Sequence, residues 1–322
     1  MGSFPGHLLP GTFFICFAFW WTTQLFRRKK LCEIKGIPYY STVTYQCGFQ
    51  KCLEWPVEGM IKVIATTIGM AGEIFAAFDY GQSSTIVSLG DIQHVTMYAF
   101  FCLSGVCDIL QARSPSVPAG LDYIAFATAF AAEGILFKFH LHGRSELDTH
   151  LHVLLVGTIF ACVAAILLEY RHPHNILASI MRTYFIFVQG TWFIQVGFIL
   201  YNPIRGFGNW DPNSHESIQL ATLIFLWHCF AVALLMTSII VFTSWLRNKY
   251  CPVSPISDEY HLVGHSSYRL IAESEDEEVH DEVDEIYGSG QTEQRTNCNG
   301  GASTGIANGN TRQSLSSIED QL

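Results

Sequence analysis

Long apolar stretches recur along the first 250 residues of this chain, separated by short polar segments. Each stretch is roughly 20 residues long or longer, the length an α-helix needs to cross the hydrocarbon core of a membrane. The pattern therefore predicts an all-α polytopic membrane bundle of about seven transmembrane helices. The predicted spans are residues 8–26, 56–78, 92–112, 119–139, 150–170, 180–201 and 217–246.

The apolar pattern stops at about Cys251. Residues 251–322 hold fourteen acidic and three basic residues, and residues 286–322 are rich in Gly, Ser, Asn, Thr and Gln. Such a segment cannot bury enough apolar surface to fold. The sequence thus predicts two parts: a seven-helix transmembrane domain over residues 1–250 and a disordered cytosolic tail over residues 251–322.

Composition supports a membrane protein. The chain is 49% hydrophobic and only 14% charged, against roughly 25% charged residues in a soluble domain. The net charge of −10 arises in the tail, because residues 1–250 hold fifteen basic and fourteen acidic residues. Neither part has the basic patch that a nucleic-acid partner requires. The predicted partner is the lipid bilayer.

The basic residues predict how the helices are oriented. The first span is followed at once by Arg27-Arg28-Lys29-Lys30, whereas a cleaved signal peptide carries its positive charge before the apolar run. We therefore expect an uncleaved anchor. If the chain crosses the membrane seven times, the loops on the same side of the membrane as the C-terminus hold ten Lys and Arg residues. The loops on the other side hold three. The positive-inside rule then predicts a lumenal or extracellular N-terminus and a cytosolic C-terminus.

Ionisable residues gather between the fourth and fifth predicted spans. His140, His142, His150 and His152 lie within thirteen residues. Imidazole and carboxylate groups inside a membrane are costly unless they are paired, hydrated or bound to something. The predicted topology brings further polar side chains to the same lumenal half of the bundle. The inner set comprises Glu73, His94, Glu133, His140, Asp148, His152 and His228.

One interpretation of this set is a site for zinc or another transition metal, since neutral imidazole and carboxylate suit zinc, iron and copper. The candidate ligands are His94, Glu133, His140, Asp148, His152 and His228. A metal-dependent membrane enzyme, either a lipid hydrolase or a redox enzyme, would use such a site to activate water or a small substrate. A haem held by two histidines is a further interpretation.

Two alternatives need no metal. The same side chains can hold helices together through interhelical hydrogen bonds, and the chain has no contiguous His-Glu-x-x-His motif. They can also line the path of a transporter or channel, although no inverted repeat is evident in the sequence. Asp108 and Glu169 lie in the other half of the bundle. We expect them to form local ion pairs with Arg113, Arg171 or Arg182.

The cysteines predict no disulfide framework, because none of the ten lies in a predicted lumenal loop. Cys32 and Cys251 flank the membrane on the predicted cytosolic side and are candidates for palmitoylation, with ordinary thiols as the alternative.

The tail contains candidate sorting motifs. Tyr260-His-Leu-Val263 and Tyr268-Arg-Leu-Ile271 both place a bulky aliphatic residue three positions after a tyrosine. An extended peptide of this form can dock into two pockets of a sorting adaptor. Ser274 stands among acidic residues and is a candidate phosphosite.

Several motifs, in order over residues 7–246, carry a family resemblance. They include Leu9-Pro-Gly-Thr-Phe-Phe14, Gln93-His-Val-Thr-Met-Tyr-Ala-Phe-Phe101, Glu133-Gly-Ile-Leu-Phe137, Gln189-Gly-Thr-Trp-Phe193 and Trp227-His228. In these motifs the chain resembles the transmembrane protein 45 family. The resemblance implies a multipass protein of Golgi, endosomal and lysosomal membranes. It implies no enzymatic activity and supplies no catalytic residues.

Together these observations favour an integral endomembrane protein that acts by interaction or trafficking rather than catalysis. Golgi, endosomal and lysosomal membranes are the expected locations, with the plasma membrane as a further one. A homo-oligomer is a candidate assembly. The metal-dependent membrane enzyme and the transporter or channel remain the alternatives.

Overall fold

The computed structural model describes residues 3–45, 55–77, 89–139, 141, 143–204 and 210–250, without the side chains of Ala76, Ala77, Leu89, Asp91 and residues 246–250. The chain divides into two units, Met1–Tyr268 and Arg269–Leu322, and every described residue belongs to the first. Several predicted features lie outside the described residues, namely His140, His142, Cys251, Tyr260, Val263, Tyr268, Ile271 and Ser274.

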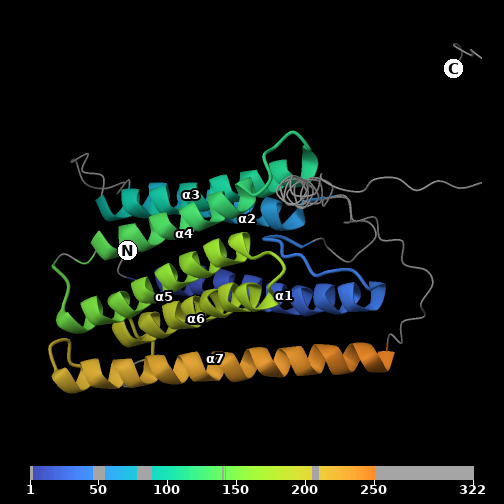
Figure 1. Ribbon diagram of the computed structural model, residues 1–322. Coiled ribbons are helices and arrows are strands. Elements are labelled where there is room, and N and C mark those ends of the chain that lie inside the picture. Colours follow the sequence, from blue (N-terminus) through green and yellow to red (C-terminus); the bar gives the residue numbers. More distant parts are fainter. Residues whose placement is uncertain are drawn as a thin grey trace, which may run out of the picture. The chain divides into compact units, whose positions relative to one another are not determined.

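The described residues form seven α-helices and no strand (Figure 1). Each helix covers one predicted apolar stretch, so the all-α fold is confirmed over these residues. The helices are α1 Phe4–Lys35, α2 Val57–Ala77, α3 Leu89–Arg113, α4 Leu121–Phe139, α5 Glu146–Arg171, α6 Ile176–Leu200 and α7 His215–Tyr250.

Five of these helices are long and apolar enough to cross a membrane: α1, α3 from Ile92 onward, α5, α6 and α7. The chain is therefore an integral membrane protein. Helices α2 and α4 have 21 and 19 residues, which also suffices for a crossing at 1.5 Å per residue. Each carries three charged residues, however, and seven crossings remain a prediction. These residues are Glu58, Lys62 and Glu73 in α2 and Asp122, Glu133 and Lys138 in α4.

Local sequence signals mark the helix ends. Ser3 caps α1 by accepting a hydrogen bond from the Gly6 amide, and Gly36 ends α1 in the left-handed conformation with φ of 65°. Ser145 caps α5 in the same way, and its first turn carries Glu146 and Asp148, which favour a helix N-terminus.

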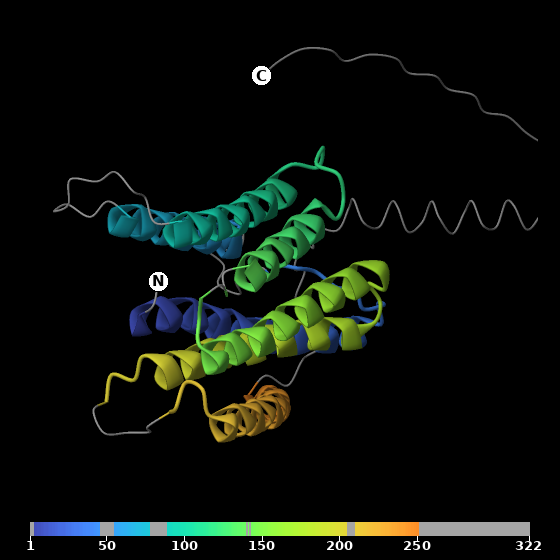
Figure 2. The ribbon, with the colours of Figure 1, turned by 90° about the vertical axis from the view of Figure 1, so that its left-hand side faces the viewer.

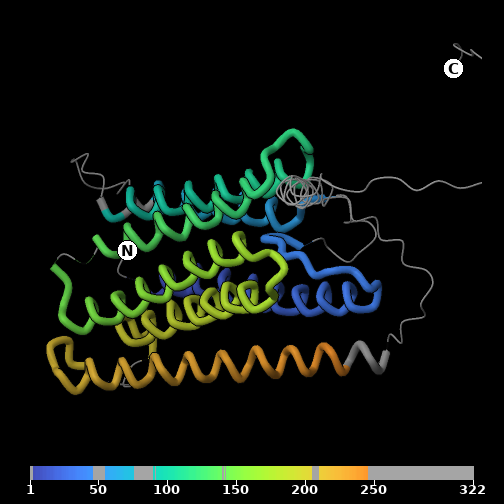
Figure 3. Tube along the Cα trace, viewed as in Figure 1, coloured from blue at the N-terminus to red at the C-terminus, as the bar shows by residue number. Residues whose placement is uncertain are grey.

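Successive helices run in alternating directions (Figures 1 and 3). Helices α1, α3, α5 and α7 begin at one end of the bundle, where α2, α4 and α6 finish. We call it the His7 end, after the histidine in the first turns of α1, and it is the end that the sequence predicts to be lumenal. The opposite end, where Tyr39 follows α1, is the Tyr39 end.

The packing divides the helices into two groups. Helix α2 lies along α3, and α3 lies against α4; in the other group α1 lies along α6, and α6 against α5. Contacts between α4 and α5 join the two groups, while α7 packs more loosely on α6, α1 and α5 (Figure 2). Aromatic side chains fill the space between the groups, among them Trp21, Phe126, Phe130 and Phe193.

Glycines allow the closest helix contacts. A Cβ atom at Gly11 of α1 would lie 2.8 Å from the carbonyl oxygen of Gly190 in α6, and one at Gly190 would lie 2.9 Å from that of Gly11. Gly59 of α2 and Gly105 of α3 meet similarly. Close backbone approach through small residues is a common way for membrane helices to associate. The α1–α6 contact also fixes the position of His7, one helical turn before Gly11.

Candidate functional site

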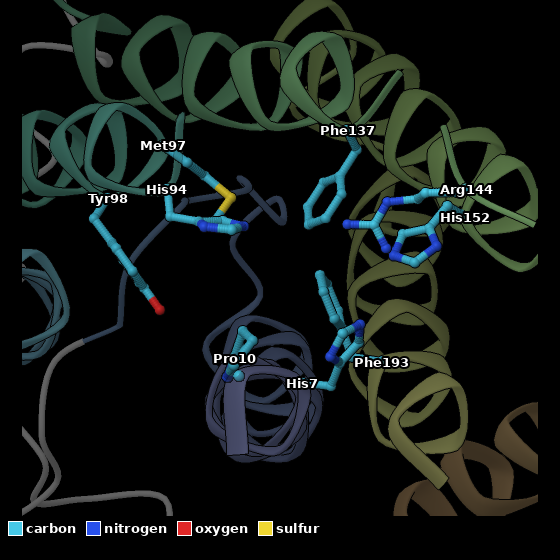
Figure 4. Close-up of a pocket in the computed structure, with 10 residues that line it drawn as sticks. His7, Pro10, His94, Met97, Tyr98, Phe137, Arg144, His152 and Phe193 are labelled. Carbon is cyan, nitrogen blue, oxygen red and sulfur yellow. The ribbon is translucent and has the colours of Figure 1, made fainter. Parts of the chain in front are cut away.

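A small cavity of about 20 Å³ lies at the His7 end, where helices of both groups meet. This volume is enough for about one water molecule. Figure 4 shows His94 on one wall and His7, Arg144 and His152 on the opposite wall. The lining residues are Gly6, His7, Pro10, His94, Met97, Tyr98, Phe137, Arg144, His152 and Phe193.

Asp148 holds two of the lining side chains in place. Its carboxylate accepts a hydrogen bond of 2.9 Å from Arg144 Nη1, and its Oδ1 lies 2.8 Å from His152 Nδ1. The His152 Nδ1 also lies 2.9 Å from the Asp148 carbonyl oxygen. Residues 148 and 152 are one helical turn apart, so this contact follows from α5 itself. His152 is 1% exposed.

His7 is likewise oriented by an oxygen atom, and His94 lies near a carboxylate. His7 Nδ1 lies 3.1 Å from the Ser3 carbonyl oxygen, and its ring centroid is 5.9 Å from that of His152. His94 Nδ1 lies 3.7 Å from Glu73 Oε2, which comes from α2. The cavity thus collects imidazoles from α1, α3 and α5 and an arginine from the turn before α5.

Two predicted site residues, Glu133 and His228, and the neighbouring His150 contact other partners. Glu133 is buried in α4, and both its oxygens accept hydrogen bonds from Gln189 Nε2, at 2.8 and 2.9 Å. His228 of α7 packs edge-on against Trp192. His150 contacts the Thr222 hydroxyl of α7 at 2.8 Å. None of them lines the cavity.

The predicted metal ligands are therefore only partly brought together. His94 and His152 line one cavity, Asp148 lies behind His152, and Glu133 and His228 are apart from them. Within the described chain, no three His, Cys, Asp or Glu side chains are close enough to hold an ion as they stand. Because His140 is outside this part, the predicted ligand set remains a prediction. Cys32, the palmitoylation candidate in α1, is 8% exposed.

The sequence pattern did not single out His7 or Arg144 as site residues. His7 stands one residue before the first predicted span and more than 130 residues from the histidine cluster. Only the packing of α1 on α6 places it beside His152. Arg144 is one of the three basic residues of the predicted lumenal loops, and its spacing of four from Asp148 signals a pair across one helical turn.

A second polar cluster lies toward the Tyr39 end. Glu169 of α5 accepts hydrogen bonds from Arg182 of α6 through Nε and Nη2 and from the Ser179 hydroxyl at 2.8 Å. Tyr123 of α4 brings its hydroxyl within 3.3 Å of Glu169. Both charged side chains are fully buried. The expected pairing of Glu169 with Arg182 is therefore present, and it joins two helices.

Asp108 pairs differently from the expectation. Its partner is Lys62 of α2, with Nζ 2.6 Å from Oδ2, rather than an arginine near its own helix end. The Lys62 ammonium also lies 4.3 Å from the centre of the Phe126 ring, a cation–π contact. One turn earlier in α2, Glu58 accepts hydrogen bonds from the indole groups of Trp20 and Trp21 of α1. The hydrogen bonds of Glu58 join the two helix groups.

Tyr39 closes this end of the bundle. Its hydroxyl lies 3.1 Å from the Ser179 hydroxyl, and its carbonyl oxygen contacts His174 Nδ1 at 2.9 Å. Burial raises the pKa of Tyr39 to about 12, so the hydroxyl stays neutral and available as a hydrogen-bond donor at physiological pH. Toward the Tyr39 end, Lys62 is thus paired with Asp108 and Arg182 with Glu169. At the His7 end, polar side chains line a cavity instead.

The fold and these sites define an integral membrane protein with polar groups buried among its helices. Residues 119–241 match the profile of a family described as a family of unknown function (DUF716). The chain is similar to transmembrane epididymal protein 1A of Mus musculus, with 24% identity over 304 residues, 88% of this chain and 96% of that protein.

Two further relatives carry a related name. Transmembrane epididymal protein 1 of Rattus norvegicus is 24% identical over 302 residues, 88% of this chain and 96% of its own length. The Homo sapiens protein of that name is 25% identical over 197 residues, 59% of this chain and 72% of its own. These similarities agree with a membrane protein and assign no reaction to it.

Proposed function

We propose that this chain is an endomembrane protein that crosses the membrane seven times and acts by binding a small ligand rather than by catalysis. The ligand site is the cavity at the His7 end, which faces the lumen in the orientation that the basic residues predict. The observation that carries the proposal is the lining: four nitrogen-bearing side chains from three parts of the chain surround one cavity inside a membrane bundle.

The surroundings of the cavity support a binding role. Pro10, Met97, Phe137 and Phe193 supply apolar walls, and a few polar groups converge between them. Small-molecule sites combine apolar walls and a few polar groups in the same way, and the volume of this cavity suits a ligand about the size of one water molecule. The supporting hydrogen bonds of Asp148 hold Arg144 and His152 in position before any ligand arrives, which lowers the entropy cost of binding.

Cysteine accessibility tests the cavity and its orientation together. Met97 lines the cavity and is 6% exposed. In Met97→Cys, a membrane-impermeant thiol reagent should label the new cysteine in opened microsomes, above the level of the wild-type protein. Sealed microsomes should give no added labelling, because only the cytosolic face is then reachable.

The matched control is Ala129→Cys, in the fully buried part of α4, which should stay unlabelled in both preparations. Absence of labelling at residue 97 in opened microsomes would reject an accessible lumenal site. Labelling at residue 97 in sealed microsomes would instead favour the transporter alternative, since it requires a path from the cytosolic face past the buried ion pairs of Lys62 and Arg182.

We further propose that the tail sorts the protein to Golgi, endosomal or lysosomal membranes, as the resemblance to the transmembrane protein 45 family implies. The candidate sorting residues are Tyr260, Val263, Tyr268 and Ile271, with Ser274 as the phosphosite. Replacing both Tyr260 and Tyr268 by alanine should shift steady-state protein to the cell surface, because each tyrosine would fill one adaptor pocket. Surface biotinylation measures the shift, and an unchanged distribution would reject the sorting role.

A further inference from the structure

We propose that Glu133 of α4 is a proton-binding site. Its carboxyl group is a neutral acid in the resting protein, is held by Gln189 of α6, and exchanges its proton with the cavity at the His7 end. This inference goes beyond the proposed ligand site, because it concerns a separate pair of side chains that lies deeper in the bundle. It gives Glu133 a role other than that of the metal ligand that the sequence suggests.

The first argument is that Glu133 is buried without a positive partner. It is 1% exposed, and no Lys, Arg or His in the described part of the chain forms an ion pair with it. The buried acid of α5 differs in this respect, since Glu169 is paired with Arg182. A lone charge is costly inside a membrane, and a carboxyl group avoids that cost by keeping its proton.

The second argument is that the side chains around Glu133 supply no charge. The Tyr98 hydroxyl of α3 and the Cys162 thiol of α5 are the titratable groups close enough to interact with its carboxyl group. A phenol and a thiol carry no charge at neutral pH. From α1, Phe14 packs on this part of α4 through its contact with the Phe130 ring. The surroundings therefore stabilise the acid rather than the carboxylate.

The third argument is that Gln189 can serve both protonation states. Its Nε2 atom lies 2.8 and 2.9 Å from the two oxygens of Glu133 and donates to them when the carboxyl group is charged. Its Oε1 atom is buried and has no hydrogen-bond partner among the described residues. Since the two ends of an amide are nearly equal in shape, a half-turn of the amide brings Oε1 to the carboxyl group. There it accepts a hydrogen bond from the O–H of the acid.

The cavity at the His7 end gives this pair a route to water. Phe137 follows Glu133 by four residues in α4, Phe193 follows Gln189 by four in α6, and both phenylalanines line the cavity (Figure 4). The pair thus lies one helical turn, about 5.4 Å, from the cavity. The two rings contact each other with centroids 5.6 Å apart and separate the pair from the cavity. A rotamer change of either ring opens the route, and water on that side then supplies or accepts the proton.

Infrared spectroscopy of the full chain in lipid nanodiscs tests the proposal, because a protonated carboxylic acid has a carbonyl band that a carboxylate lacks. At neutral pH the wild-type protein should show one such band that is absent from Glu133→Gln. The band should shift in D₂O as the acid proton exchanges, and it should disappear as the pH is raised within the range in which the protein stays folded. Glutamine is neutral and nearly equal in size, so Glu133→Gln should fold and should unfold at the same SDS fraction as the wild-type protein.

Glu146→Gln is the matched control. It makes the same chemical change at an exposed position in the first turn of α5, so the band should be as in the wild-type protein. Gln189→Leu tests the partner of the acid. It should shift the band without removing it, because Glu133 stays buried and loses its hydrogen bond.

Two outcomes would overturn the proton site. Identical carbonyl bands of the wild-type protein and Glu133→Gln at every pH would show that Glu133 holds no proton. A band that responds neither to D₂O nor to pH would show a proton that does not exchange with the cavity. Labelling of Met97→Cys tests the ligand site separately, so a labelled Met97→Cys without a Glu133 band would remove the proton site and keep the ligand site.

Discussion

Replacing Glu169 by alanine is expected to lower the free energy of unfolding by about 3–5 kcal/mol, because it leaves a buried positive charge without its partner. Arg182 is fully buried and donates to both oxygens of Glu169. Without that carboxylate, the guanidinium keeps, among the described residues, a hydrogen bond of 3.2 Å to the carbonyl oxygen of Thr42 and a cation–π contact with the ring of Trp21. Unfolding in mixed micelles with increasing SDS measures the loss.

The double variant Glu169→Leu with Arg182→Met is the control for this prediction. It removes both charges and keeps side chains of similar volume, and such replacements of a buried ion pair are often close to neutral. We therefore expect the double variant to be more stable than Glu169→Ala. If the single variant is as stable as the wild-type protein, the pair is not buried as described, and the packing of α5 on α6 at the Tyr39 end needs revision.

Replacing Gly190 by alanine is expected to destabilise the protein by about 1–3 kcal/mol, because it forces α1 and α6 apart. The added Cβ would lie 2.9 Å from the carbonyl oxygen of Gly11 and from the amide nitrogen of Ile15. Both contacts are with backbone atoms, which cannot rotate away as a side-chain end can. Unfolding in mixed micelles with increasing SDS measures the loss.

Gly157→Ala is the matched substitution. Gly157 lies in the middle of α5, and no atom of another helix in the described structure lies within 4 Å of a Cβ added there. Alanine should therefore be neutral or slightly stabilising, since it favours the helix relative to glycine. Equal losses of stability in the two variants would show that the effect arises from helix propensity and would contradict a close α1–α6 contact.

The helices were predictable from the sequence because apolar length is a local property. Each predicted span falls on one observed helix, and the structure adds residues at several ends, such as Phe4–His7 and Arg27–Lys35 of α1. Those additions are polar or interfacial turns that hydropathy leaves out, but Ser3 and Gly36 supply the capping chemistry that sets the ends. The number of crossings and their orientation depend on the membrane and remain predictions.

The partners of buried charges were predictable only where one helix or one turn connects them. The pair of Arg144 and Asp148 is four residues apart and the pair of Glu169 and Arg182 thirteen. Lys62 and Asp108 are 46 residues apart, and their contact depends on how α2 lies along α3 through Gly59 and Gly105. No local pattern in the sequence carries that information.

The candidate site was predictable only in part, for the same reason: contacts between helices far apart in the sequence leave no local pattern. The cluster around His152 was evident because its members are close in sequence. His7 joins it only through the contact of Gly11 with Gly190, and Glu133 leaves it because Gln189 occupies its carboxylate. The sequence indicated polar side chains toward the His7 end, but which of them share a cavity is decided by helix rotation and packing.

The most direct test of a ligand site at the His7 end is a density map of the full chain in lipid nanodiscs, obtained by electron cryo-microscopy without chelators. The account predicts density beyond that of the protein, enclosed by His7, His94, Arg144 and His152, and its loss in His152→Gln. A map in which side chains close this space, with no further density between the three imidazoles, would contradict it.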